Sequence, residues 1–167
     1  LRIWSSGCSS GEEPYRLAML ALQEAADQGR GVKVVILARD LDPLMLEKAK
    51  QGRYPASAFQ QIPPAMLQRW FKPEGDFYRV SEELRQAVSF RILDLFSSPP
   101  PPSLDLLLCR NVMIYFSRDL QQKLLRAYHQ ALRPGGIFIT GKTETVLGPV
   151  RSTFVCLSAR SRIFERA

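Results

Sequence analysis

The sequence predicts an α/β fold: a mostly parallel, seven-stranded sheet with helices on both faces and a small antiparallel insertion. The chain opens with an apolar segment at Leu1–Trp4, a glycine and serine loop at Ser5–Gly11 and an amphipathic pattern at Pro14–Gln28. The run Val32–Arg39 is almost unbroken in β-branched residues and leucine, which is typical of a parallel strand covered on both faces. The same alternation resumes after a proline-rich interruption at 53–88. These three observations predict βαβ units.

Turn and capping residues bound the two helices of the first half. Pro14 suits the first turn of its helix, and Gly29 ends that helix. Asp42 and Pro43 then predict the N-cap and first turn of a second, short helix, which Gly52 closes. The first βαβ unit is therefore complete at that glycine.

The region that follows breaks the α/β rhythm with four prolines. We expect short strands in it, together with a short helical run near Met66–Phe71 and the segment FYRVSEEL at Phe77–Leu84. We therefore predict a small inserted β-subdomain at 53–88, which interrupts a core formed by residues 1–52 and 89–167.

The second half restores the alternation of strands and helix. Ser117 is predicted to cap a helix whose apolar side extends to Leu132 and which the RPGG sequence stops. The sequence SSPPPPS at Ser97–Ser103 predicts a stiff, polyproline-like spacer. The remaining strands are predicted at Phe90–Leu93, Leu104–Cys109 and Ile137–Thr140, and as two β-like segments within Phe154–Glu165.

Composition limits the function classes. The 167 residues include three cysteines without CxxC spacing and a single histidine, His129, so no metal site is expected. Cys8 and Cys109 are predicted to be buried and His129 to face solvent. No apolar run reaches the roughly 18 to 20 residues of a bilayer span, so we expect a soluble, cytoplasmic protein without membrane insertion. The net charge of +7 favours anionic partners, either nucleic acid or an acidic protein surface.

The loop between the first strand and the first helix predicts a ligand site. Gly7 and Gly11 allow a tight turn and a close approach of the backbone. Their spacing is G-x-x-x-G rather than the G-x-G-x-x-G of dinucleotide sites, and Glu12 and Glu13 stand where a pyrophosphate would lie. A ligand with a cationic group therefore fits better than a phosphate.

Two acidic residues close neighbouring strands of the predicted sheet. Asp40 ends the second strand, where doubly wound folds place an acid that accepts both hydroxyls of a ribose. Asp94 ends the third strand and suits either an exocyclic amine, such as adenine N6, or a turn cap. Together with the glycine loop, these acids predict a nucleoside pocket without a phosphate cradle. S-adenosylmethionine, an adenosine joined through a sulfonium to a zwitterionic methionine, has these features.

Four segments carry a family resemblance over nearly the whole chain. They resemble the catalytic domain of the chemotaxis receptor methyltransferases, the CheR family, and CRNVMIYF before a capped helix is the most specific of them. The resemblance implies a Rossmann-like class I methyltransferase that uses S-adenosylmethionine to methylate glutamates on the cytoplasmic helices of chemotaxis receptors, with no nucleic-acid partner. The segments are SSGCSSGEEPYRLAM from Ser5, ARDLD at Ala38–Asp42, CRNVMIYFS at Cys109–Ser117 and LRPGGIFITGKTE at Leu132–Glu144.

The same resemblance implies roles for individual residues around the cofactor and the acceptor. The cofactor-binding residues would be Ser6 and Glu12 at the methionine portion beside the Gly7 turn, Asp40 at the ribose, Asp94 and Leu95 at the adenosine, and Arg110 and Asn111 near the sulfonium. Tyr115 would face the acceptor carboxylate, and with Arg110 it forms the predicted catalytic pair.

The chain departs from the family pattern at positions that bear on substrate choice. Arg39 replaces a threonine at the second strand, and Lys142 with Thr143 replaces histidine and serine after the fifth. The family's N-terminal helical domain is expected to be absent from this chain. The family's small β-subdomain binds a receptor tether peptide in some members, and the short loop between Phe71 and Phe77 predicts a member that does not need the tether.

Two alternatives to the receptor methyltransferase stay open. The net charge of +7 suggests a nucleic-acid methyltransferase, although amino-methylating members carry an NPPY-like sequence where this chain has RNVMIY. The substitutions at Arg39 and Lys142 suggest a module that binds S-adenosylmethionine as a sensor or scaffold without transferring the methyl group.

Overall fold

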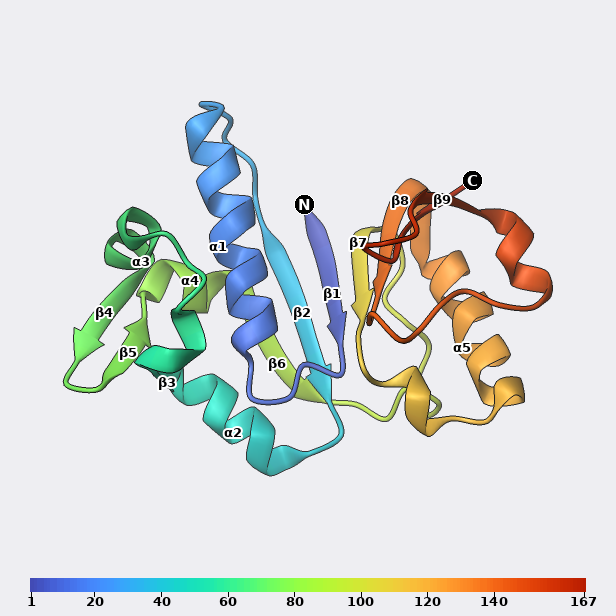
Figure 1. Cartoon of the computed structure of the whole chain (residues 1–167), viewed down its shortest axis with the longest axis horizontal. Coiled ribbons are helices and arrows are strands. Elements are labelled where there is room, and N and C mark those ends of the chain that lie inside the picture. The colour runs from blue at the N-terminus through green and yellow to red at the C-terminus, as the bar shows by residue number, and fades with distance from the viewer. The chain divides into compact units, whose positions relative to one another are not determined.

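The computed structural model describes all residues from Leu1 to Ala167, and the chain divides into two compact units (Figure 1). The first unit contains Leu1–Gly7 and Leu93–Ala167, and the second contains Cys8–Ile92. No helix in the chain is both long enough and apolar enough to cross a bilayer.

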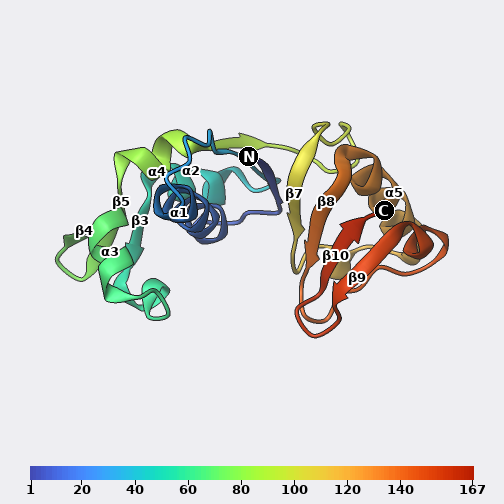
Figure 2. The same ribbon diagram turned by 90° about the horizontal axis from the view of Figure 1, so that it is seen from above.

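The first unit is built on five strands in the order β1, β7, β8, β10 and β9 (Figure 2). β1 pairs with β7 and β7 with β8 in parallel, whereas β10 is antiparallel to both of its neighbours. The parallel pairs put the carboxyl ends of three strands at one edge, which is where α/β sheets bind ligands. The strands are β1 (Arg2–Ser6), β7 (Leu104–Cys109), β8 (Leu132–Thr140), β9 (Phe154–Ser158) and β10 (Ile163–Arg166).

Helix α5 (Arg118–Ala131) packs on this sheet through its apolar side. The Ser117 hydroxyl accepts the Leu120 N–H at 3.5 Å, which confirms the predicted cap. Tyr128 is fully buried, and its ring lies edge-on to that of Trp4 with 5.4 Å between the ring centroids. The helix therefore fixes the middle of the sheet.

The predicted end of this helix was wrong by one residue, and the following strand is longer than predicted. Leu132 is extended and pairs with Leu104, so the RPGG sequence lies inside β8 rather than between helix and strand. The pairing of β7 with β8 shifts register between Leu104 and Leu106. A bulge of this kind accommodates a proline and two glycines in a strand.

The second unit contains a parallel pair of strands and two of the predicted helices. β2 (Val35–Asp40) pairs with β6 (Val88–Ile92), and β2 begins three residues later than predicted. Helix α1 (Glu12–Asp27) begins two residues earlier than predicted and buries Tyr15. Helix α2 (Pro43–Gln51) has the predicted bounds, with Asp42 accepting two backbone N–H groups at its start and Gly52 in the left-handed conformation at its end.

A separate three-stranded antiparallel sheet lies between α2 and β6 in the sequence, with β5 in the middle. Its core is aromatic, and the indole N–H of Trp70 donates to Gln23 of α1 at 3.0 Å. Helix α4 (Glu82–Ala87) was not predicted; the Ser81 hydroxyl accepts the Leu84 N–H at its start. The other elements here are β3 (Arg53–Pro55), a 3-10 helix (Ala56–Phe59), α3 (Pro64–Trp70), β4 (Phe71–Glu74) and β5 (Phe77–Val80).

The predicted fold class is confirmed. Five of the expected seven strands lie in the first unit and two in the second. All of them except β9 and β10 pair in parallel with a neighbour in the same unit. The small antiparallel sheet is also present.

Candidate active site

In the second unit, a glycine loop leads into the first helix. The Cys8 N–H donates to the Arg39 carbonyl at 2.9 Å, which ties the loop to the end of β2, and the Gly11 N–H donates to the Cys8 carbonyl at 3.0 Å. Gly11 has a φ of +92°, and a Cβ there would lie 2.7 Å from the Cβ of Ala49. Only glycine allows this close approach of the loop to α2.

The Asp40 carboxylate lies beside this loop and is held by two backbone groups. Its Oδ2 accepts the Ser9 N–H at 2.7 Å, and its Oδ1 accepts the Asp42 N–H at 3.0 Å. A carboxylate has about four acceptor positions, so each oxygen keeps a lone pair for a further donor. A half-buried carboxylate oriented in this way is suited to the two hydroxyls of a ribose, which is the role predicted for Asp40.

The start of α1 carries two acidic residues beside the glycine loop. Glu12 and Glu13 occupy the first turn, and Glu12 Oε2 accepts the Ser10 hydroxyl at 2.7 Å. The positive end of the helix dipole stabilises carboxylates at these positions. The two acids supply negative charge to the glycine loop, which fits an amino or sulfonium group and repels a pyrophosphate.

Two of the cysteines and the histidine lie partly or wholly inside the protein. Burial, and next the charge of Asp40, raises the pKa of Cys8 to about 12, so its thiol is protonated at neutral pH. Cys109 is also buried, as predicted. The expectation that His129 faces solvent was wrong: it is half-buried, its ring lies edge-on to that of Phe154, and burial, then Arg166, lowers its pKa.

In the first unit, the buried carboxylate of Glu144 accepts hydrogen bonds from the loop that follows β7. Glu144 is only 5% exposed. Its Oε2 accepts the N–H groups of Asn111 and Gly141, both at 2.8 Å, and its Oε1 accepts those of Val112 at 3.0 Å and Met113 at 2.8 Å. Four donors satisfy the carboxylate, which explains how a charge is tolerated in a buried position.

This carboxylate determines the backbone of the predicted catalytic segment. Asn111 has a φ of +60°, an uncommon conformation that its N–H bond to Glu144 helps to hold. A Cβ at Gly141 would lie 2.9 Å from the Asn111 nitrogen, so glycine lets the loops after β7 and β8 touch. Glu144 is the last residue of a motif in the sequence, and no role was predicted for it.

Ser6 and Gly7 lie at the carboxyl end of β1, where they meet this segment and α5. The Ser6 hydroxyl lies 2.6 Å from the hydroxyl of Tyr128, whose pKa burial raises, and Ser6 has no exposed surface. Gly7 has a φ of +80°, and a Cβ there would clash with Val112. The side chain of Ser6 is therefore used inside the protein, so a contact with a ligand would come from its backbone.

Asp94 forms a turn after β6. Its Oδ1 accepts the Phe96 N–H at 2.9 Å, and its carbonyl accepts the Ser97 N–H at 3.1 Å and the Ser97 hydroxyl at 2.9 Å. The turn cap, one of the two roles predicted for Asp94, is therefore filled by Oδ1. The exocyclic-amine role stays a prediction, and Oδ2 is the atom that would perform it.

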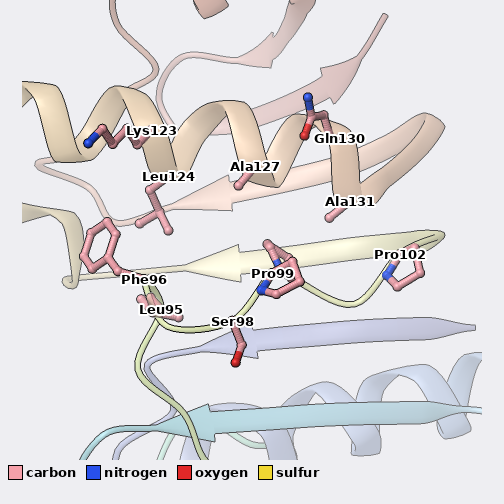
Figure 3. A pocket seen from close by; sticks show the side chains of 11 residues that line it. Leu95, Phe96, Ser98, Pro99, Pro102, Lys123, Leu124, Ala127, Gln130 and Ala131 are labelled. Atoms are coloured by element: carbon pink, nitrogen blue, oxygen red, sulfur yellow. The ribbon is translucent and has the colours of Figure 1, made fainter.

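The loop after Asp94 lines a cavity of about 450 Å³ against α5 (Figure 3). Leu95, Phe96 and three of the prolines form one wall, and Lys123, Leu124 and neighbouring residues of α5 form the other. The prolines that were predicted to act as a spacer therefore also form part of this wall. The predicted contact of Leu95 with adenosine stays a prediction.

Tyr115 ends the 3-10 helix at Met113–Tyr115, and its side chain is 80% exposed. The Ser117 cap of α5 and the Glu144 bonds fix the segment on either side of it. An aromatic ring presented to solvent from a fixed segment is suited to contact an incoming macromolecule.

The predicted site residues thus form two groups, one in each unit. Glu12 and Asp40 share the glycine loop of the second unit. The others belong to the first unit, where the structure brings Gly7 against the segment that follows β7. They are Ser6, Gly7, Asp94, Leu95, Arg110, Asn111 and Tyr115.

A family model described as "CheR methyltransferase, SAM binding domain" matches residues 1–163. The chain belongs to the CheR methyltransferase family. The motifs quoted from the sequence therefore identified the family correctly, and the name of the family specifies S-adenosylmethionine as the ligand of this domain.

Relatives of this CheR domain include proteins of different sizes. Chemotaxis protein methyltransferase 2 of Pseudomonas aeruginosa is 40% identical over 150 residues, which cover 86% of this chain and 53% of that protein. A 104.1 kDa protein of Rhodobacter capsulatus is 38% identical over 165 residues, 99% of this chain but only 17% of that protein. The chain thus spans about half the length of the chemotaxis methyltransferases it matches, and less of the larger protein.

A solved structure supports the fold of the CheR domain. The TehB-like SAM-dependent methyltransferase from Corynebacterium glutamicum has a TM-score of 0.53 at 18% identity, covering 99% of this chain and 77% of that one. At this identity the likeness concerns the Rossmann-like fold alone.

Proposed function

We propose that this CheR domain binds S-adenosylmethionine and transfers its methyl group to glutamate side chains on the cytoplasmic helices of chemotaxis receptors, in the cytoplasm. The family match over residues 1–163 is the observation that carries this proposal. The 40% identity to a chemotaxis protein methyltransferase supports the choice of acceptor.

The residues present fit the cofactor. Asp40, oriented by two backbone N–H groups, would accept the ribose hydroxyls, and Glu12 would face the cationic methionine portion. Asp94 with Leu95 would contact the adenosine, and Arg110 with Asn111 would border the sulfonium. When bound, S-adenosylmethionine would supply an electrophilic methyl group on sulfur. Attack by a carboxylate oxygen would form the methyl ester, break the methyl–sulfur bond and leave S-adenosylhomocysteine as the product.

The acceptor needs no general base. A glutamate with a pKa near ~4.3 is already ionised at neutral pH, so no residue has to remove a proton. Arg110 would guide the carboxylate and Tyr115 would contact it. Holding the reacting groups in line contributes roughly 7 to 11 kcal/mol, and the exclusion of water removes the hydration shell of the nucleophile.

An assay with methyl-labelled S-adenosylmethionine, this protein and receptor-containing membranes tests the proposed function. We expect receptor-containing membranes to acquire label from methyl-labelled S-adenosylmethionine, and mild base to release that label as methanol, because methyl esters hydrolyse. Cofactor binding without any labelled protein would instead identify a sensor or scaffold. Base-stable label on nucleic acid would identify a nucleic-acid methyltransferase.

The small antiparallel sheet is the part of the family fold that binds a receptor tether peptide in some members. β4 and β5 are joined by a tight turn at Gly75, and Glu74 forms ion pairs with Arg53 at 3.1 Å and Arg79 at 2.6 Å. We propose that this subdomain, inserted at 53–88, does not need a receptor tether. Calorimetric titration with a receptor C-terminal peptide should show no micromolar binding; micromolar binding would contradict the proposal.

A further inference from the structure

A second cavity lies in the first unit at the carboxyl ends of β7 and β8. Its volume is about 400 Å³. It is lined by Leu108, Arg110, Ile139, Thr140, Lys142, Arg160 and Ser161. The start of β10 is antiparallel to the end of β8, so the turn between β9 and β10 forms one wall of the cavity. None of the roles proposed above uses Lys142, Arg160 or Ser161.

The charged side chains that line this cavity are all cationic. Its lining includes three cationic side chains, those of Arg110, Lys142 and Arg160, and no aspartate or glutamate. Lys142 and Arg160 take part in none of the ion pairs of the structure. Cationic side chains in a concave site whose lining carries no acidic side chain create a field that attracts anions. Glu144 lies close to this lining, but its carboxylate is bonded to four backbone N–H groups.

The two walls that carry Lys142 and Arg160 are bonded to each other. The Arg162 Nε donates to the Lys142 carbonyl at 3.1 Å, and the Thr140 N–H donates to the Arg162 carbonyl at 3.1 Å. The Ser161 N–H donates to the Ser158 hydroxyl at 3.1 Å, which closes the turn that presents Arg160. The cations therefore extend from a fixed frame.

We propose that this cavity binds an acidic segment of the acceptor protein, with Lys142 and Arg160 contacting carboxylates next to the glutamate that is methylated. The inference rests on the proposed function, and it adds two residues, Lys142 and Arg160, that would select an acceptor with further acidic side chains. Leu108 and Ile139 add apolar surface, which suits the methylene groups of glutamate side chains.

A protein segment fits this cavity better than a nucleic acid does. Single-stranded nucleic acids are held by basic grooves in which aromatic rings stack on the bases, and the lining of this cavity contains no aromatic residue. Lys142 lines the same cavity as Arg110, so its charge lies where an acidic acceptor would pass Arg110.

Fluorescence anisotropy on the whole chain, saturated with S-adenosylhomocysteine, tests the inference. The probe is a fluorescein-labelled, alanine-based helical peptide with paired glutamates, compared with the same peptide carrying glutamines. We expect Lys142→Gln with Arg160→Gln to weaken glutamate-peptide binding about three- to tenfold at low salt, the range for two solvent-accessible ion pairs. The loss should shrink as salt is added.

The matched control removes the same charge elsewhere on the surface. Arg30 and Arg126 are exposed and do not line the cavity, so Arg30→Gln with Arg126→Gln should leave peptide affinity within about twofold. Equal weakening by both pairs, unchanged affinity in the Lys142 and Arg160 variant, or equal binding of the glutamine peptide would overturn the inference. So would tighter binding of a single-stranded oligonucleotide that depends on Lys142 and Arg160.

Calorimetry with S-adenosylhomocysteine separates this inference from the proposed function. Both double variants should keep the cofactor affinity of the unaltered chain, which also shows that they fold. If the chain binds no S-adenosylhomocysteine while its peptide affinity still depends on Lys142 and Arg160, the proposed function fails and the acidic-peptide site stands.

Discussion

Replacing Asp40 with alanine should abolish measurable binding of S-adenosylhomocysteine. The substitution removes both acceptors proposed for the ribose, and each hydrogen bond to a charged group contributes about 1.5 to 3 kcal/mol. The loss corresponds to a weakening of about 10²- to 10⁴-fold. The same change also leaves the N–H groups of Ser9 and Asp42 without their partner, so the glycine loop loses its anchor. Isothermal titration calorimetry measures the effect directly.

Two variants separate the ribose role from a general effect of charge. Asp40→Asn keeps one acceptor oxygen and should show an intermediate affinity. Asp27→Ala removes an exposed carboxylate at the end of α1 and should leave the affinity unchanged. An unaltered affinity in Asp40→Ala would remove the ribose assignment, provided that circular dichroism shows the same fold in all variants.

The elements predicted most closely are those whose ends carry local signals. Helix α2 was predicted from its Asp42 cap and its closing Gly52, and the structure shows both: two N–H bonds to the Asp42 carboxylate and a left-handed glycine. Strand β7 has the predicted bounds, because an apolar run interrupted only by Asp105 lies between a proline-rich segment and the polar pair Arg110 and Asn111. In both cases the information lies within a few residues of the element itself.

The elements that were missed depend on residues far away in the chain. The RPGG sequence favours a turn locally, yet the pairing of Leu132 with Leu104 draws it into β8, because strand pairing outweighs local preference. Helix α4 has only six residues, too few for an apolar periodicity to be recognised. Its local signals are the Ser81 cap and the two acidic residues of its first turn, in a segment for which short strands were predicted.

In the candidate site, too, residues with a local signal could be predicted and residues that depend on distant partners could not. Asp40 could be predicted because the end of a parallel strand is a known place for a ribose-binding acid. Glu144 could not, because its partners at Asn111, Val112 and Met113 lie about thirty residues earlier, and no spacing rule connects them. Its buried environment becomes visible only when the ends of β7 and β8 lie side by side. A loop whose backbone N–H groups have no partner within the loop is the feature that could have indicated such an acceptor.

Replacing Glu144 with glutamine should destabilise the chain and weaken cofactor binding together. Glutamine has one acceptor oxygen, and its amide group would point donors at backbone N–H groups that now donate to the carboxylate. Each buried donor left without a partner costs about 1 to 3 kcal/mol. We therefore expect the free energy of unfolding to fall by about 2 to 5 kcal/mol in chemical denaturation, and Glu144→Ala to lower it further.

The effect on the cofactor distinguishes a positioning role from a purely structural one. Glu144 is buried and bonds to the backbone of residues 111–113. The groups that would touch the cofactor are Arg110 and Asn111. At a temperature where the Glu144→Gln variant is fully folded, its affinity for S-adenosylhomocysteine should still fall about tenfold or more, because the Asn111 backbone loses its anchor. Glu24→Gln, an exposed change on α1, should alter neither stability nor affinity appreciably. A folded Glu144→Gln variant with unchanged affinity would show that the carboxylate supports the fold without positioning the site.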